Sequence, residues 1–205
     1  MSFLFIDSTY DVTLGILDEE MDWVDLRRHK GLKASTIIQA EVFDLFRKHS
    51  IDPRGLGAVI FVNGPGFYTG LRLSEGFSDV FEFFGVPHYS FYSYEVPRWC
   101  GVEKGRWFTK AYRGEYFLHD WDGEGQRSRL LSSTELPTME PCERYFIHSE
   151  TSLDELSSKF VPDPVQTVDL LREQPKAIFQ QVLGQGLRRE VFYFRAPEDE
   201  FKVST

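Results

Sequence analysis

The chain has 205 residues, of which 41% are apolar and 27% charged, an ordinary composition for a globular protein with a sizeable core. Its net charge of −9, with the basic residues scattered, argues against a protein that grips a nucleic-acid backbone by itself. No segment approaches the ~20 apolar residues of a membrane span, and the two cysteines lack CxxC spacing, so we expect a cytoplasmic protein with free thiols and no membrane contact.

The first half of the chain predicts an α/β unit. Continuous apolar runs are typical of strands buried on both faces, alternating runs indicate a meander, and apolar residues at helical spacing indicate helices. The predicted elements are strands over Phe3 to Ile6, Val12 to Leu17 and Met21 to Leu26, a helix over Lys33 to Lys48, a strand over Gly57 to Val62, a helix over Leu73 to Phe84, and a strand or ordered loop over Tyr89 to Tyr94.

The second half is less regular, and we find no internal repeat in the sequence. The predicted elements are a hairpin of Trp107 to Lys110 with Glu115 to Trp121, a short strand over Arg144 to Ile147, a helical segment around Val168 to Leu171, a helix over Ala177 to Leu187 and a last strand over Val191 to Phe194.

The most informative segment is the glycine loop between the second buried strand and the helix that follows it. It contains Gly64, Pro65, Gly66, Thr69 and Gly70. Glycines at the end of a strand let the backbone approach a partner or ligand closely, and the next helix supplies free N–H donors. Taken alone, glycine density is also explained by a tight turn from strand to helix.

The string GPGFYTGLR, residues 64 to 72, resembles the GPGSFTGLR signature of the TsaB (YeaZ) family, bacterial proteins needed for threonylcarbamoyl modification of adenosine in transfer RNA. The likeness is strongest over residues 1 to 98 and continues weakly over Lys110 to Tyr116. Phe67 replaces the signature serine and Ser74 replaces a glycine.

The order of elements is similar to the N-terminal lobe of the actin-like ATPase superfamily. The resemblance therefore implies an α/β fold of the actin-like (ASKHA, ribonuclease H-like) type. We expect an N-terminal lobe over residues 1–98 that carries the helix-pair interaction surface, and a reduced, divergent second lobe over residues 99–205.

Asp7, Ser8 and Thr9 occupy the place where actin-like phosphotransferases carry a phosphate-binding turn. A carboxylate there holds metal-bound water in working enzymes. The usual glycine is absent and we find no second phosphate turn, so we interpret the three residues as a vestigial nucleotide site. Ser8 and Thr9 then bond only to local backbone. The five histidines show no metal-binding spacing, and no nucleophile elbow is present, so we expect no catalytic and no metal-binding residue.

The two long helices carry more apolar residues than one sheet face covers, which predicts a second buried face. We expect a partner interface there. Arg72, in the first turn of its helix, is unfavourable to the helix dipole, so a carboxylate or carbonyls at the partner contact would hold it, with a solvent-facing arginine as the alternative. The predicted interface residues are Ile38, Phe46, Arg72, Phe77, Phe81 and Phe84.

The resemblance implies a non-catalytic subunit of the complex that forms N6-threonylcarbamoyladenosine in transfer RNA. Its partners are a TsaD-type catalytic subunit and a TsaE-type ATPase, and the RNA is contacted only indirectly. We expect the chain alone to require no cofactor and the complex to hold any ATP or ADP with Mg²⁺. We also expect the isolated chain to form a homodimer, because the apolar surface of its two helices is otherwise exposed to water. The alternative is a small actin-fold phosphotransferase that binds Mg-nucleotide at Asp7 and the glycine loop. A peptidase lacks any nucleophile or metal motif.

Overall fold

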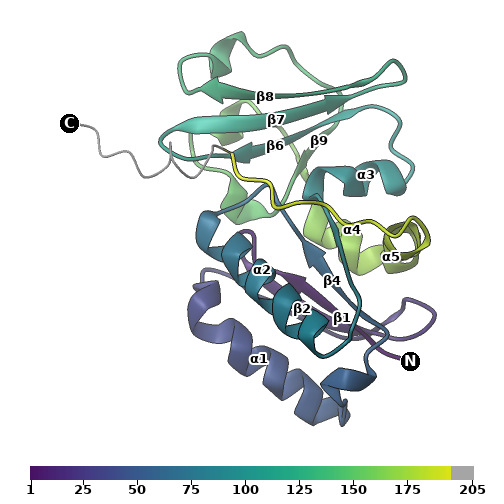
Figure 1. Ribbon diagram of the computed structural model, residues 1–205. Coiled ribbons are helices and arrows are strands. Elements are labelled where there is room, and N and C mark those ends of the chain that lie inside the picture. The colour runs from purple at the N-terminus through teal and green to yellow at the C-terminus, as the bar shows by residue number, and fades with distance from the viewer. Residues whose placement is uncertain (195–205) are drawn as a thin grey trace.

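The first sheet is built around β1 (Phe3–Asp7), which lies at its centre in the computed structural model, where residues 1–194 are described (Figure 1). Its strand order is β3-β2-β1-β4-β5. The meander β1–β2–β3 is antiparallel, whereas β4 and β5 run parallel to β1. The other strands are β2 (Val12–Leu17), β3 (Trp23–His29), β4 (Ala58–Val62) and β5 (His88–Phe91).

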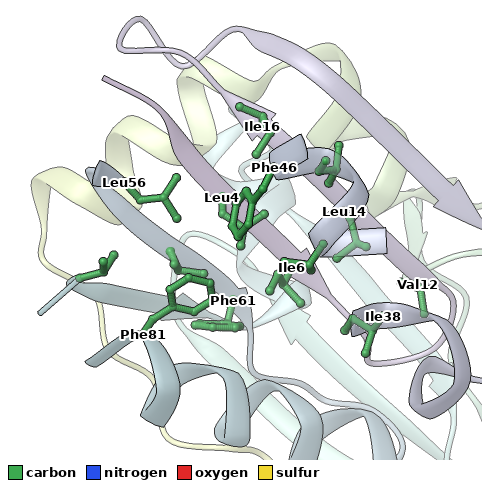
Figure 2. Close-up of a cluster of buried hydrophobic side chains, with 14 residues drawn as sticks. Leu4, Ile6, Val12, Leu14, Ile16, Ile38, Phe46, Leu56, Phe61 and Phe81 are labelled. Atoms are coloured by element: carbon green, nitrogen blue, oxygen red, sulfur yellow. The ribbon is translucent and has the colours of Figure 1, made fainter. Parts of the chain in front are cut away.

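One face of this sheet is covered by two long helices that lie side by side, α1 (Ala34–His49) and α2 (Tyr68–Phe83) (Figure 1). Alternate residues of the strands, such as Leu4 and Ile6, point toward these helices. Figure 2 shows them packed against Ile38 and Phe46 of α1 and Phe81 of α2. The spacing of the buried residues in α1 follows the 3.6-residue helical period, as predicted.

The opposite face is covered by helices from the second half of the chain, α4 (Thr167–Glu173) and α5 (Pro175–Gly184), together with the short α3 (Val96–Trp99). Phe179 of α5 packs on Phe5 with ring centroids 5.4 Å apart, and the Trp23 indole donates to the carbonyl of Leu171 over 2.9 Å. The predicted boundary at residue 98 therefore does not separate the two packing units, because residues 167–184 complete the core of the first.

The second sheet has the strand order β10-β9-β6-β7-β8. Its antiparallel meander β6–β7–β8 and its parallel strands β9 and β10 repeat the plan of β1–β2–β3, β4 and β5. The fold is thus duplicated although the sequence shows no repeat. The strands are β6 (Gly105–Lys110), β7 (Glu115–Trp121), β8 (Gln126–Ser132), β9 (Tyr145–Ile147) and β10 (Val165–Gln166).

The second lobe is reduced, as expected, because short 3₁₀ turns stand where the first lobe has long helices. Two connections, β8 to β9 and β9 to β10, contain only such turns, whereas α1 and α2 fill the equivalent connections of the first lobe. The 3₁₀ helices of the described chain are η1 (Pro53–Gly55), η2 (Ser93–Glu95), η3 (Leu136–Thr138), η4 (Glu150–Ser152) and η5 (Ser157–Lys159).

Three sequence-based assignments need correction. Helix α2 begins at Tyr68 rather than Leu73, because Thr69 and Gly70 already form its first turn. Strand β8 was missed, since its largely exposed residues carry little apolar signal. The predicted strand over 191–194 is absent: the Phe192 N–H donates to the Asn63 carbonyl, and the rings of Phe192 and Phe194 pack on the second sheet. Within residues 1–194 no helix has both the length and the apolar character to cross a membrane.

Candidate functional site

The turn that follows β1 is buried where the two lobes meet. Asp7 and Thr9 are fully buried and Ser8 is 2% exposed. One oxygen of the Asp7 carboxylate, Oδ1, accepts from the Thr9 amide at 3.0 Å and from the Thr9 hydroxyl at 2.6 Å. Thr9 thus bonds the Asp7 side chain, and the Ser8 hydroxyl donates to the distant Gly70 carbonyl over 2.8 Å, so the expectation that both residues bond local backbone was wrong.

His148 of the second lobe occupies the other side of the Asp7 carboxylate. It directly follows β9, and its Nε2 lies 2.7 Å from Asp7 Oδ2 and 3.1 Å from Thr9 Oγ1. The imidazole is 1% exposed, so the contact between the lobes excludes water. The sequence analysis tested His148 only for metal-binding spacing and missed this role. The usable signal was its place at the end of a predicted strand.

The residues at this turn do not fit Mg²⁺ or a nucleotide bound as in a working phosphotransferase. Such a site needs an accessible carboxylate for metal-bound water, whereas both oxygens of Asp7 are buried against Thr9 and His148. In the duplicated second sheet, the corresponding turn after β6 contains Lys110, Arg113 and Gly114 and offers no equivalent carboxylate. In the described part of the chain, no group of three acidic, histidine or cysteine residues is placed to hold a metal ion.

The glycine loop approaches the chain's own backbone. A Cβ on Gly70 would overlap the carbonyl oxygen of Ser8, and one on Gly66 would lie 2.8 Å from the carbonyl oxygen of Thr9. Gly64, with φ of +115°, would bring its Cβ within 2.8 Å of the Phe192 carbonyl oxygen. The close approach predicted from these glycines therefore serves internal packing.

Polar contacts extend this junction toward the edge of the molecule. The Thr109 hydroxyl donates to the Tyr10 hydroxyl over 2.6 Å, and Tyr10 donates to the Lys110 carbonyl over 3.2 Å. Burial raises the pKa of Tyr10 far above its ordinary value, so the phenol stays neutral. Lys30 pairs with Glu150 at 3.1 Å near the surface. A cavity of about 520 Å³ opens beside these contacts, and Thr69 and Gly70 form part of its wall.

The helix pair presents a different set of side chains from the predicted one. Ile38, Phe46 and Phe81 are 1%, 9% and 3% exposed, and Phe77 is partly buried against the same core. The prediction placed the wrong stripe outward, because both stripes of α2 are apolar and periodicity alone does not orient them. Phe84, at 38% exposed, does reach the surface. The outer apolar patch consists of Phe43, Val80, Phe83 and Phe84.

Arg72 lies in the second turn of α2 and is held within its own chain. Its guanidinium donates to Glu75 over 2.8 Å and to the Tyr68 hydroxyl over 3.1 Å. The Tyr193 hydroxyl donates to the same carboxylate over 3.1 Å. The hydrogen bond to Tyr68 and the charge of Glu75 raise the pKa of Arg72. A carboxylate does hold this cation, as expected, but it comes from the next turn of the helix.

The duplicated sheets, with a buried junction at the ends of β1 and β9, define an actin-like ATPase fold with a reduced second lobe. Among solved structures, YeaZ from Pseudomonas aeruginosa is similar, with a TM-score of 0.61 and 16% identity over 91% of this chain and 95% of that one. A protein described as having similarity to peptidase YEAZ from Pseudomonas aeruginosa has the same TM-score and identity over 93% of this chain and 99% of its own. The predicted resemblance is thus confirmed for the fold. No protein-family model and no curated protein matches the sequence.

We predict that Gly70→Ala lowers the free energy of unfolding by about 2–3 kcal/mol, because the added methyl overlaps the Ser8 carbonyl. Gly76→Ala is the matched control. It lies on the exposed side of the same helix with nothing within 4 Å, and should raise stability by about 0.5–1 kcal/mol. Urea unfolding of both variants measures the difference. Equal stability of the two would contradict the close approach.

We predict that His148→Ala lowers the free energy of unfolding by about 3 kcal/mol, because Asp7 then stays buried without its partner. Since the two side chains act as a pair, Asp7→Asn combined with His148→Ala should cost less than the sum of the single changes.

The control for this pair is His49→Ala, which removes another histidine from an aspartate, Asp25. Asp25 keeps Lys48 and Arg27; although burial raises its pKa, these contacts and His49 lower it to about 2. We expect a loss of about 1 kcal/mol or less in this control. Chemical denaturation compares the variants, and a His148→Ala loss no larger than that of His49→Ala would refute the role of the buried contact.

Proposed function

We propose that this chain is a TsaB-type, non-catalytic subunit of the complex that forms N6-threonylcarbamoyladenosine in transfer RNA. It binds a TsaD-type catalytic subunit through the outer side of α1 and α2. The fold shared with YeaZ over most of both chains and the signature-like glycine loop support this assignment.

The observation that carries the proposal is the outer apolar patch. Phe83 is 86% exposed, Phe43 is 68% exposed and Val80 is 51% exposed, all on two adjacent helices. Each such side chain gains about 1.5–3 kcal/mol on burial, so a surface of this kind is suited to a protein partner. Arg72 and Glu75 supply charges further along α2 that can order the rim of the interface.

The rest of the assembly follows from the same assignment. A TsaE-type ATPase joins the complex, and any ATP or ADP with Mg²⁺ belongs to the complex rather than to this chain. The net charge of −9 supports indirect contact with transfer RNA, because a polyanion is repelled by an acidic surface. Without its partner, the isolated chain would form a homodimer through the same patch, since a two-fold contact buries it on both copies.

The competing function, a small phosphotransferase, would use Asp7 and the glycine loop. The burial of Asp7 against His148 and the packing of Gly66 and Gly70 against the β1 turn argue against it. Nothing in the site specifically favours this alternative.

We predict that Phe83→Asp weakens binding to the TsaD-type subunit at least tenfold, because a carboxylate at the centre of an apolar contact is buried without a partner. Isothermal titration with the purified subunit from the same organism measures the affinity. The isolated Phe83→Asp chain should also be a monomer by light scattering. Phe83→Leu, which keeps the apolar contact, should bind within a few fold of the original chain.

The matched control for this surface is Leu156→Asp, which places the same charge on a side chain that is 41% exposed in the second lobe. It should bind normally. If Phe83→Asp and Phe43→Asp both fold and bind with unchanged affinity, the interface does not lie on α1 and α2.

We predict that the isolated chain releases no phosphate from ATP above background. The reason is that no accessible carboxylate stands at the end of β1 to hold metal-bound water. A phosphate-release assay with Asp7→Ala as the comparison tests this. Turnover that is present in the original chain and lost in Asp7→Ala would favour the phosphotransferase.

A further inference from the structure

A polar pocket of about 320 Å³ is lined by residues of α3, α5 and the second sheet. Figure 1 shows α3 and α5 on the side of the first sheet away from α1 and α2. Arg98 and Trp99 line it from α3, and His119 and Gln126 from β7 and β8. Gln181 of α5 and Gln185, which directly follows that helix, also line it, and Glu95 with Arg189 closes one side. The volume lies at the lower end of the range for small-molecule sites, which fits a compact metabolite.

His119, one of the lining residues, carries a buried ring nitrogen without a hydrogen-bond partner in the described chain. The residue is 3% exposed, and its ring stacks on Tyr94 with centroids 4.1 Å apart. Its Nδ1 lies 2.8 Å from the Ser128 hydroxyl, while its buried Nε2 has no hydrogen-bond partner within residues 1–194. Leaving such a group unpaired costs about 1–3 kcal/mol, which a hydrogen-bonding ligand would recover.

The charges around the pocket favour an anion. Glu95 is already neutralised, because Arg189 donates to it over 2.6 Å and the Tyr92 amide donates to it over 2.8 Å. Arg98 donates to Gln126 over 2.9 Å, and no carboxylate of the described chain lies within ion-pair distance of its guanidinium. One positive charge is therefore left without a counter-charge, in a chain whose net charge is −9.

The imidazole can complement an oxyanion as a neutral donor. Burial, opposed by the charge of Asp120 and assisted by that of Arg98, lowers the pKa of His119 to about 4. The ring is thus neutral at physiological pH. The contact between Nδ1 and the Ser128 hydroxyl is compatible with either tautomer of the neutral ring. In the tautomer that carries the hydrogen on Nε2, Ser128 donates to Nδ1 and Nε2 is a donor without an acceptor.

We propose that this pocket binds a small metabolite through a carboxylate or phosphate group, with Arg98 supplying the charge and His119 Nε2 a hydrogen bond. The side-chain amides of Gln181 and Gln185 take the remaining polar part of the ligand. The proposal does not depend on the function assigned above, because α1 and α2 lie on the other face of the first sheet and stay free for a partner.

The test follows the His119 ring nitrogens by long-range ¹H–¹⁵N NMR on the ¹⁵N-labelled full chain. Succinate and inorganic phosphate are the probes, with sodium chloride at matched ionic strength as the blank. We expect a saturable shift of the Nε2 signal with at least one probe. A response to succinate alone assigns the site to carboxylates, and a response to phosphate alone assigns it to phosphate esters.

Arg98→Gln should lower the affinity for the responding probe at least tenfold. Arg98 is exposed, so this change leaves the core intact. The matched control is Arg127→Gln, which removes an exposed arginine from the same sheet outside the pocket and should leave the affinity unchanged. A probe that binds the folded chain should raise its Tm. His119→Phe, which keeps the ring stack on Tyr94, should abolish this rise. No saturable shift with either probe, or equal affinity in Arg98→Gln and Arg127→Gln, would overturn the proposal.

Discussion

A carboxylate removed from water must find a partner, and this requirement governs the centre of the molecule. Asp7 ends the central strand of the first sheet, and the partner that meets it, His148, ends a strand of the second. Within the first lobe, the turn that carries Asp7 leaves room only for glycine at positions 66 and 70. The Asp7 carboxylate is occupied by contacts within the protein itself.

The first lobe was largely predictable because its signals are local. Two buried strands appear as continuous apolar runs, and α1 follows helical spacing, so both strands and the helix lie within one or two residues of their predicted bounds. The second lobe was less predictable, because its sheet is held by pairing between distant strands. β8 is a polar edge strand that forms only against β7, and the duplicated strand order emerges from that pairing rather than from any likeness of sequence.

The site was predicted in part, and the failures have a common cause. The sequence identified the glycine loop and the turn at Asp7, since residue type and strand position carry that information. It did not show that the loop faces Ser8 and Thr9, because that contact depends on packing within the first lobe. Nor did it show that His148 arrives from 139 residues beyond Thr9, because that contact depends on how the lobes dock. Phe81 was placed outward and Phe83 was not, because both stripes of α2 are apolar and periodicity does not show which one faces the first sheet.

The return of α4 and α5 to the first sheet ties the order of synthesis to the order of folding. Until residue 184 has left the ribosome, the face of the sheet that carries Phe5, Ile60 and Phe91 has no cover. The amino-terminal half therefore emerges as an aggregation-prone intermediate. A nascent chain that stalls midway exposes aromatic surface to chaperones and proteases. It also makes the two lobes a single cooperative unit, in which neither is expected to melt while the other stays intact.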